Sequence, residues 1–114
     1  MARRLKRRYL AVYAEPKADP EDIARAIESA YEELFGKLGL ASAMLRPVRS
    51  YPDKGVAIIR CSLESLPKTI LAIASVTRIG EKRAALRILS VSGTMRSLRD
   101  RLEEEENSLR RVGR

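Results

Sequence analysis

Apolar residues recur along this chain with two different periods, and each period predicts one kind of element. Residues 5–14 alternate between two faces, as a β-strand does. Leu10 and Val12 share one face of this strand. The other face carries Tyr9, Ala11 and Tyr13.

Residues 19–39 follow the helical period instead. Asp19 is a suitable N-cap, Pro20 suits the first helical position, and Gly39 is the expected C-cap. Between them an apolar stripe runs through Ile23, Ile27, Ala30, Tyr31, Leu34 and Leu38. We expect an amphipathic helix here.

Two strands joined by a turn are predicted next. Residues 43–50 form the first, and Pro47, which cannot donate to a ladder, places it at a sheet edge. Residues 51–55, YPDKG, are typical of a turn and lead into KGVAIIRC at 54–61. Together they predict a β-hairpin.

A helix, a strand and a further helix complete the pattern. In the helix Ser65 is the expected N-cap and Pro67 lies in the first turn, ahead of an apolar stripe of Ile70, Ile73, Ala74 and Thr77. After a basic connector at 78–83, the strand at 84–92 places Leu86 and Ile88 opposite Arg87, Leu89 and Val91. The last helix carries Met95, Leu98 and Leu102 on one stripe.

The order strand, helix, strand, strand, helix, strand is that of the ferredoxin-like, RRM-like α/β sandwich. We therefore predict four antiparallel strands with two helices on one face and an additional C-terminal helix. The chain of 114 residues is expected to form one domain. A basic arm at 1–5 precedes its core at about 6–102, and a charged tail follows at about 103–114.

The second face of this sheet is too apolar to lie comfortably in water. It is predicted to hold Tyr9, Tyr13, Val56, Ile58, Leu89 and Val91. An apolar patch of several hundred Å² on a monomer usually marks a binding site. Either a partner protein or the chain's own third helix is expected to cover it.

KGVAIIRC also matches the framework of the RNA-recognition octapeptide, K/R-G-F/Y-G/A-F-V-x-F/Y. Val56 and Ile58 stand where that motif has its base-stacking aromatic residues. Aliphatic side chains cannot replace those rings, whose stacking contributes about 1–3 kcal/mol per base. The strand is thus expected to bind protein rather than bases, although Tyr9 remains a candidate stacking residue.

Charge points to a polyanionic partner. The formal net charge is +8, and 17 of the 23 basic residues are Arg, which binds phosphate bidentately. A well-solvated basic surface is the alternative explanation. No apolar run is long enough for a membrane span, and we expect an intracellular, cytoplasmic protein.

The sequence lacks the residue types and motifs of common catalytic sites. It contains no His and a single cysteine, Cys61, which excludes His-based triads and Cys/His metal clusters. Neither GxxxxGK[ST] nor GxGxxG occurs. We expect no catalytic residue, no metal ligand and no cofactor on this chain.

The most specific local motif is the turn Ser92, Gly93 and Thr94 between the last strand and the last helix. Thr94 can cap that helix, which carries Arg96 and Arg99 three residues apart. Free N–H groups at a helix start, with Arg beside them, are suited to hold a phosphate. An ordinary capped turn is the other interpretation.

Three segments carry a resemblance to a known family: KRRYLAVYAEP, KGVAIIRC and SVSGTMRSLR. They resemble the archaeal ribonuclease P protein component 2 family, over about residues 6–102. The resemblance implies a non-catalytic subunit that binds and stabilises the catalytic domain of the ribonuclease P RNA for 5′ maturation of precursor tRNA.

It further implies pairing with ribonuclease P protein component 3, a TIM-barrel-like protein, and assembly of two such pairs into a heterotetramer. Mg²⁺ is expected on the RNA. Precursor tRNA would be contacted indirectly, and no membrane is involved.

The side chains predicted to contact RNA phosphates are all basic: Arg3, Arg4, Lys6, Arg7, Arg8, Arg46, Arg49, Lys54, Arg78, Lys82, Arg83, Arg96 and Arg99. Three other classes of protein share this fold. One is a ribosomal or other RNA-binding protein. The second is a ligand-sensing dimer, for which no effector loop is evident, and the third is an acylphosphatase-like enzyme, whose Gly-rich phosphate cradle is replaced here by EPKAD.

Overall fold

The protein is described by a computed structural model that covers residues 6–112, with side chains described for residues 6–104. The predicted arm at 1–5, with Arg3 and Arg4, lies outside the described residues. No helix within the described part is long and apolar enough to cross a bilayer.

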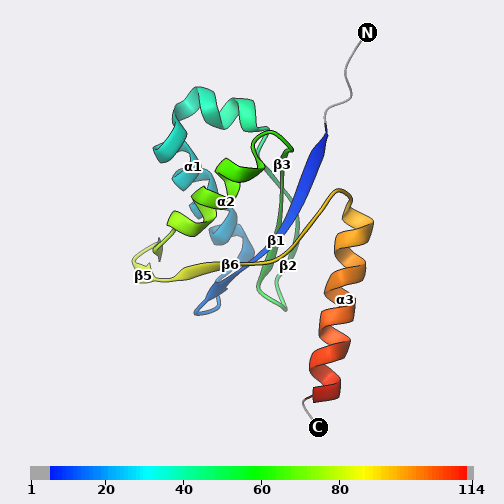
Figure 1. The fold of residues 1–114 in the computed structure, drawn as a ribbon. Helices are drawn as coiled ribbons and strands as arrows, with labels where there is room; N and C mark the ends of the chain where they lie inside the picture. Colours follow the sequence, from blue (N-terminus) through cyan, green and yellow to red (C-terminus); the bar gives the residue numbers. More distant parts are fainter. Residues whose placement is uncertain (1–5, 113–114) are drawn as a thin grey trace.

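Four strands form the main sheet: β1 (Arg7–Glu15), β2 (Arg46–Tyr51), β3 (Val56–Ser62) and β6 (Ala85–Ser92). They pair antiparallel in the order β2-β3-β1-β6, which is the ferredoxin-like order, and the predicted fold class is confirmed (Figure 1). The helices are α1 (Pro20–Ala43), α2 (Leu66–Ser75) and α3 (Met95–Val112).

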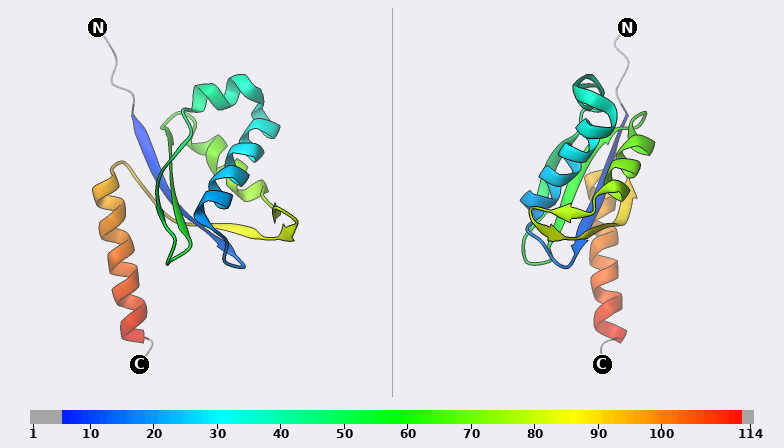
Figure 2. Two further views of the ribbon diagram at one scale, coloured as in Figure 1. Left: turned by 180° about the vertical axis from the view of Figure 1, so that it is seen from behind. Right: turned by 90° about the vertical axis from the view of Figure 1, so that its left-hand side faces the viewer.

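The sheet separates two apolar layers. Helices α1 and α2 cover one face, and α3 lies on the other (Figure 2). On the first face, side chains of β1 and β3 pack against α1 in the main core, which includes Leu10, Val12, Ile23, Ile27, Ala57, Ile59 and Cys61. The predicted division of β1 and β3 into two faces is confirmed.

Helix α1 begins as predicted but does not end at Gly39. Asp19 accepts a hydrogen bond from the backbone N–H of Glu21 at 3.1 Å, and Pro20 opens the helix. Gly36, at φ +76°, breaks the helical geometry, and the helix then continues to a left-handed C-cap at Met44. Leu34, just before the break, and Leu38, just after it, are exposed rather than buried as predicted.

Helix α2 packs through a different stripe from the one predicted. Thr69, Ala72 and Ile73 are buried, whereas Ile70 and Ala74 are exposed and Thr77 lies beyond the helix. Thr69 is accommodated because its hydroxyl donates to the Ser65 carbonyl at 2.9 Å. Ser65 precedes the helix, but its side chain makes no capping hydrogen bond.

The segment 78–92 holds two departures from the prediction. The connector is a small hairpin of β4 (Arg78–Ile79) and β5 (Lys82–Arg83). In β6, Val12 lies opposite Ile88 whereas Ala11 lies opposite Ser90, so that Leu89 is an extra residue in a β-bulge. After the bulge, Val91 lies opposite Leu10 and packs on the α1/α2 side. The placement of Val91 on the second face was therefore wrong.

Cys61 is fully buried against the helices, and burial raises the pKa of its thiol. A side-chain hydrogen bond with Thr69 and the charge of Arg8 oppose that rise in pKa less strongly. The pKa of Cys61 is thus higher in the folded state than in the unfolded state. The neutral, buried thiol therefore makes its full contribution to folding stability at pH values below the ordinary thiol pKa. That contribution is lost as the pH rises through the raised pKa.

We expect Cys61 to be unreactive toward a thiol reagent in the native protein at mildly alkaline pH and to react fully in guanidinium chloride. The thiolate is the reactive form, and here it is both disfavoured and inaccessible. Absorbance after addition of a disulfide reagent measures the reaction. Native labelling at the rate of a free thiol would contradict the burial.

Candidate RNA-binding and partner-binding surfaces

The second face of the sheet is occupied by the chain's own last helix. Ala11, Ile58 and Leu98 are each 0% exposed and form one cluster, with Leu89, Met95 and Leu102 packed around it. The sequence left a partner protein and α3 as alternative occupants of this face. In the structure α3 takes this place, so Ile58 and Val56 are core residues.

The turn at residues 92–94 attaches α3 to the sheet. The Ser92 hydroxyl accepts from the Thr94 N–H at 3.3 Å, and the Thr94 hydroxyl accepts from the Ser97 N–H at 3.1 Å. Thr94 is therefore the N-cap of α3, as predicted. One turn further on, Arg101 donates to the Val91 carbonyl at 2.7 Å and to the Ser90 hydroxyl at 3.3 Å.

Positive charge surrounds this turn. An open hollow of about 380 Å³ is lined by Arg8, Val91, Ser92, Gly93, Thr94, Ser97 and Arg101. A Cβ atom added to Gly93 would lie 3.3 Å from a guanidinium nitrogen of Arg8, so glycine admits the close approach of that side chain. Arg96 and Arg99 are exposed on α3. Arg101, which sequence reasoning missed, is recognisable only once its contact with β6 is known.

A second basic site lies at the turn between β2 and β3. The Arg49 guanidinium lies 5.7 Å and the Lys54 ammonium 5.8 Å from the centre of the Tyr51 ring. Both distances fit cation–π contacts. Tyr51 is half-buried and packs on the α3 side of the sheet. The sequence indicated the two cations but not that both lie close to the ring of Tyr51.

The predicted RNA-contacting residues do not form one surface. Arg78, Lys82 and Arg83 are exposed on the β4–β5 hairpin. That hairpin lies across the molecule from α3 (Figure 1). Lys6 and Arg7 are exposed at the start of β1, and Arg46 at the start of β2. Whether any of these side chains touches RNA stays a prediction.

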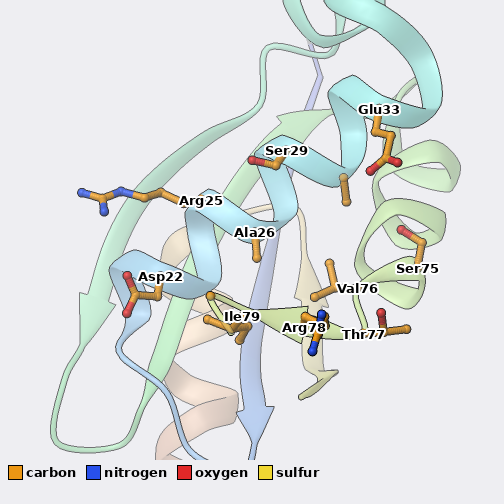
Figure 3. A pocket seen from close by; sticks show the side chains of 12 residues that line it. Asp22, Arg25, Ala26, Ser29, Glu33, Ser75, Val76, Thr77, Arg78 and Ile79 are labelled. Atoms are coloured by element: carbon orange, nitrogen blue, oxygen red, sulfur yellow. The ribbon is translucent and has the colours of Figure 1, made fainter. Parts of the chain in front are cut away.

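A cleft lies between α1 and β4, beside the end of α2 (Figure 3). Its volume is about 570 Å³, and its charged lining residues are Asp22, Arg25, Glu33 and Arg78. Asp22 and Glu33 are separated by eleven residues of one helix, which corresponds to about 16 Å. The two carboxylates are thus too far apart for paired acid–base chemistry. Within the described residues, no group of three acidic or cysteine side chains is placed to hold a metal ion.

Comparison with known proteins matches residues 8–103 to the Rpp14/Pop5 family, which covers nearly the whole domain just described. The chain belongs to the Rpp14/Pop5 family. Archaeal relatives carry the name ribonuclease P protein component 2. The protein from Methanosarcina mazei is 33% identical over 105 residues, which are 90% of this chain and 89% of that protein.

Two other archaeal members agree with this family assignment. The Archaeoglobus fulgidus protein of the same name is 35% identical over 82% of this chain and 84% of its own length. The Pyrococcus furiosus protein is 31% identical over 82% of this chain and 80% of its own length. The resemblance seen in the sequence is confirmed, and these relatives support an archaeal origin and a ribonuclease P subunit role in tRNA processing.

A similar fold is present in a solved assembly. A chain in the cryo-EM structure of yeast ribonuclease MRP superposes with a TM-score of 0.62, over 96% of this chain and 98% of that chain. The identity is 14%, so this likeness concerns the fold alone. It extends to α3, because the coverage of this chain is nearly complete.

Proposed function

We propose that this chain is a non-catalytic protein subunit of ribonuclease P that binds and stabilises the catalytic domain of the ribonuclease P RNA. In this role it would support cytoplasmic 5′ maturation of precursor tRNA. The observation that carries the proposal is the family match over residues 8–103. Mg²⁺ and bond cleavage would belong to the RNA, and the partner protein would be ribonuclease P protein component 3, in a heterotetramer of two pairs.

The chemistry of the surface supports RNA as the ligand. Arg96 lies in the first turn of α3 and Arg99 in the second, and both are exposed. The N–H groups of the first turn carry the positive end of the helix dipole. Arg8 lies beside the same turn. Each phosphate neutralised by such a group releases counterions, which makes the affinity salt-dependent.

The identity of the RNA decides between this proposal and a ribosomal protein of the same fold. The tagged protein is purified from its native host under native conditions, and its bound RNA is sequenced. We expect ribonuclease P RNA to be enriched over total cellular RNA. Enrichment of ribosomal RNA in its place would contradict the proposal.

Replacement of both Arg96 and Arg99 with Ala is expected to weaken RNA binding about tenfold or more at physiological salt. The slope of log affinity against log salt should become shallower by about 2, because two phosphate contacts are lost. Filter binding over a salt series measures both quantities. The control is Arg25→Ala with Lys37→Ala, which removes the same charge from exposed positions of α1. An effect equal to that of the control would show that Arg96 and Arg99 do not bind RNA.

A further inference from the structure

Two arginines face each other across neighbouring strands at one end of the sheet. Arg46 of β2 lies directly opposite Arg60 of β3, and Arg60 lies opposite Tyr9 of β1. Directly opposed residues project to the same face of a sheet. Arg60 also follows Ile58 by two positions, so this row projects to the face that α3 covers. The row Arg46, Arg60 and Tyr9 is called the arginine row below.

Helix α3 leaves part of this face open. Its contacts with the sheet are concentrated on β6 and β1, at the far side from β2. Arg46 is exposed, and Arg60 and Tyr9 are half-buried. The two guanidinium groups of the arginine row are therefore accessible beside α3.

Nothing in the described part of the chain neutralises the two arginines. Like charges directly opposite each other on a sheet are destabilising. Neither Arg46 nor Arg60 forms an ion pair with any carboxylate among residues 6–104. A bound anion would remove this repulsion, and guanidinium groups are suited to phosphate because they donate two parallel hydrogen bonds.

Further cations extend the arginine row into a line. Arg49 lies one row along β2, opposite Ile58, and Lys54 stands over Tyr51 at the end of the hairpin. Successive residues of an α-helix are rotated by about 100° around its axis. Arg99 and Arg101 of α3 therefore lie on opposite sides of the apolar stripe formed by Leu98 and Leu102. Because Arg101 contacts β6, Arg99 lies on the flank away from that edge. A polymer with repeated phosphates fits a line of cations better than a single small anion does.

We propose that the arginine row is an RNA backbone site, in which Arg46 and Arg60 together bind one phosphate. The inference rests on the proposed function and adds Arg60, which the sequence did not single out for RNA. The open half of the α3 face would then contact RNA, while its covered half belongs to the protein core.

The test uses the full-length double variant Arg46→Ala with Arg60→Ala and a labelled transcript of the Methanosarcina mazei ribonuclease P RNA. Filter binding at several salt concentrations should show an affinity loss of about tenfold or more, with a salt slope shallower by about 2. The double variant Arg46→Lys with Arg60→Lys keeps the charge but not the bidentate geometry. Its affinity for the transcript should lie between those of the Ala variant and the wild type. The control is again Arg25→Ala with Lys37→Ala.

Thermal unfolding gives a readout that is independent of RNA. Because the repulsion is removed, the double Ala variant should unfold at the same temperature as the wild type or at a higher one. If the double Ala variant is instead less stable than the wild type, RNA binding is tested with the Lys variant and with the single variant Arg46→Ala, which lies at an exposed edge position. A loss of affinity no greater than that of the control, for all of these variants, would overturn the inference.

The failures of the two proposals are distinguishable. If the wild type binds the transcript and the arginine-row variants bind equally well, the row is not an RNA site and the proposed function stands. If the wild type itself shows no salt-dependent binding, the proposed function fails, and the inference fails with it. The arginine-row variants can also be purified from the native host. If they retain their affinity for RNA but lose a protein that co-purifies with the wild type, the row binds a protein partner and the inference is overturned.

Discussion

Replacing Ile58 with aspartate is expected to leave the protein largely unfolded. Ile58 is 0% exposed between β3 and α3, in a cluster of apolar side chains where a carboxylate would be removed from water. Burial of a charge among apolar side chains belongs to the most destabilising substitutions, with losses on the order of 4–5 kcal/mol or more. Small domains have total stabilities of roughly 5–15 kcal/mol. Circular dichroism and urea unfolding measure the result.

The matched control for this substitution is Ile70→Asp. Ile70 is 40% exposed on α2, so its replacement leaves the new carboxylate in water. It should cost about 1 kcal/mol or less, mainly through the lower helix propensity of Asp. A folded Ile58→Asp variant with an equally small loss would mean that α3 does not seal this face.

Replacing Leu98 with alanine is expected to lower the free energy of unfolding by about 2–5 kcal/mol, because it opens a cavity in the cluster under α3. Leu98 is 0% exposed and, among residues 95–104 of α3, is the one that is fully buried in that cluster. Urea unfolding gives the loss, and binding of a hydrophobic dye reports whether α3 detaches from the sheet.

Leu38→Ala makes the same chemical change at a residue that is 86% exposed. It should alter the free energy of unfolding by no more than about 0.5 kcal/mol. Equal losses for the two variants would show that Leu98 is not buried in solution, and the arrangement of α3 on the sheet would then be wrong.

The period of the apolar residues was sufficient to predict the order of the main elements. It also assigned β1 and β3 correctly, because both strands alternate without interruption. Prediction failed where the backbone departs from regular geometry. The bulge at Leu89 moves Val91 to the other face, and Leu38 is exposed just after the break at Gly36. Neither the bulge nor the break can be recognised from the periodic pattern of apolar and polar residues.

The candidate surfaces show the same limit. Thr94 could be predicted as a cap, since capping depends on residues that are close in sequence. The pairing of Arg46 with Arg60 depends on the register of β2 and β3, which an irregularity between Pro47 and Arg49 sets. The occupant of the second sheet face was also undecided, because a helix stripe and a partner surface require the same apolar residues.

The position of β1 in the middle of the sheet has a consequence for biosynthesis. Its neighbours β3 and β6 come later in the chain, and Tyr9 pairs with Ser92. Strand β1 therefore leaves the ribosome long before β6 exists, and α3 follows β6. Until then Ala11 and Ile58 lack their cover, so the nascent chain presents an apolar surface to chaperones and to other nascent chains.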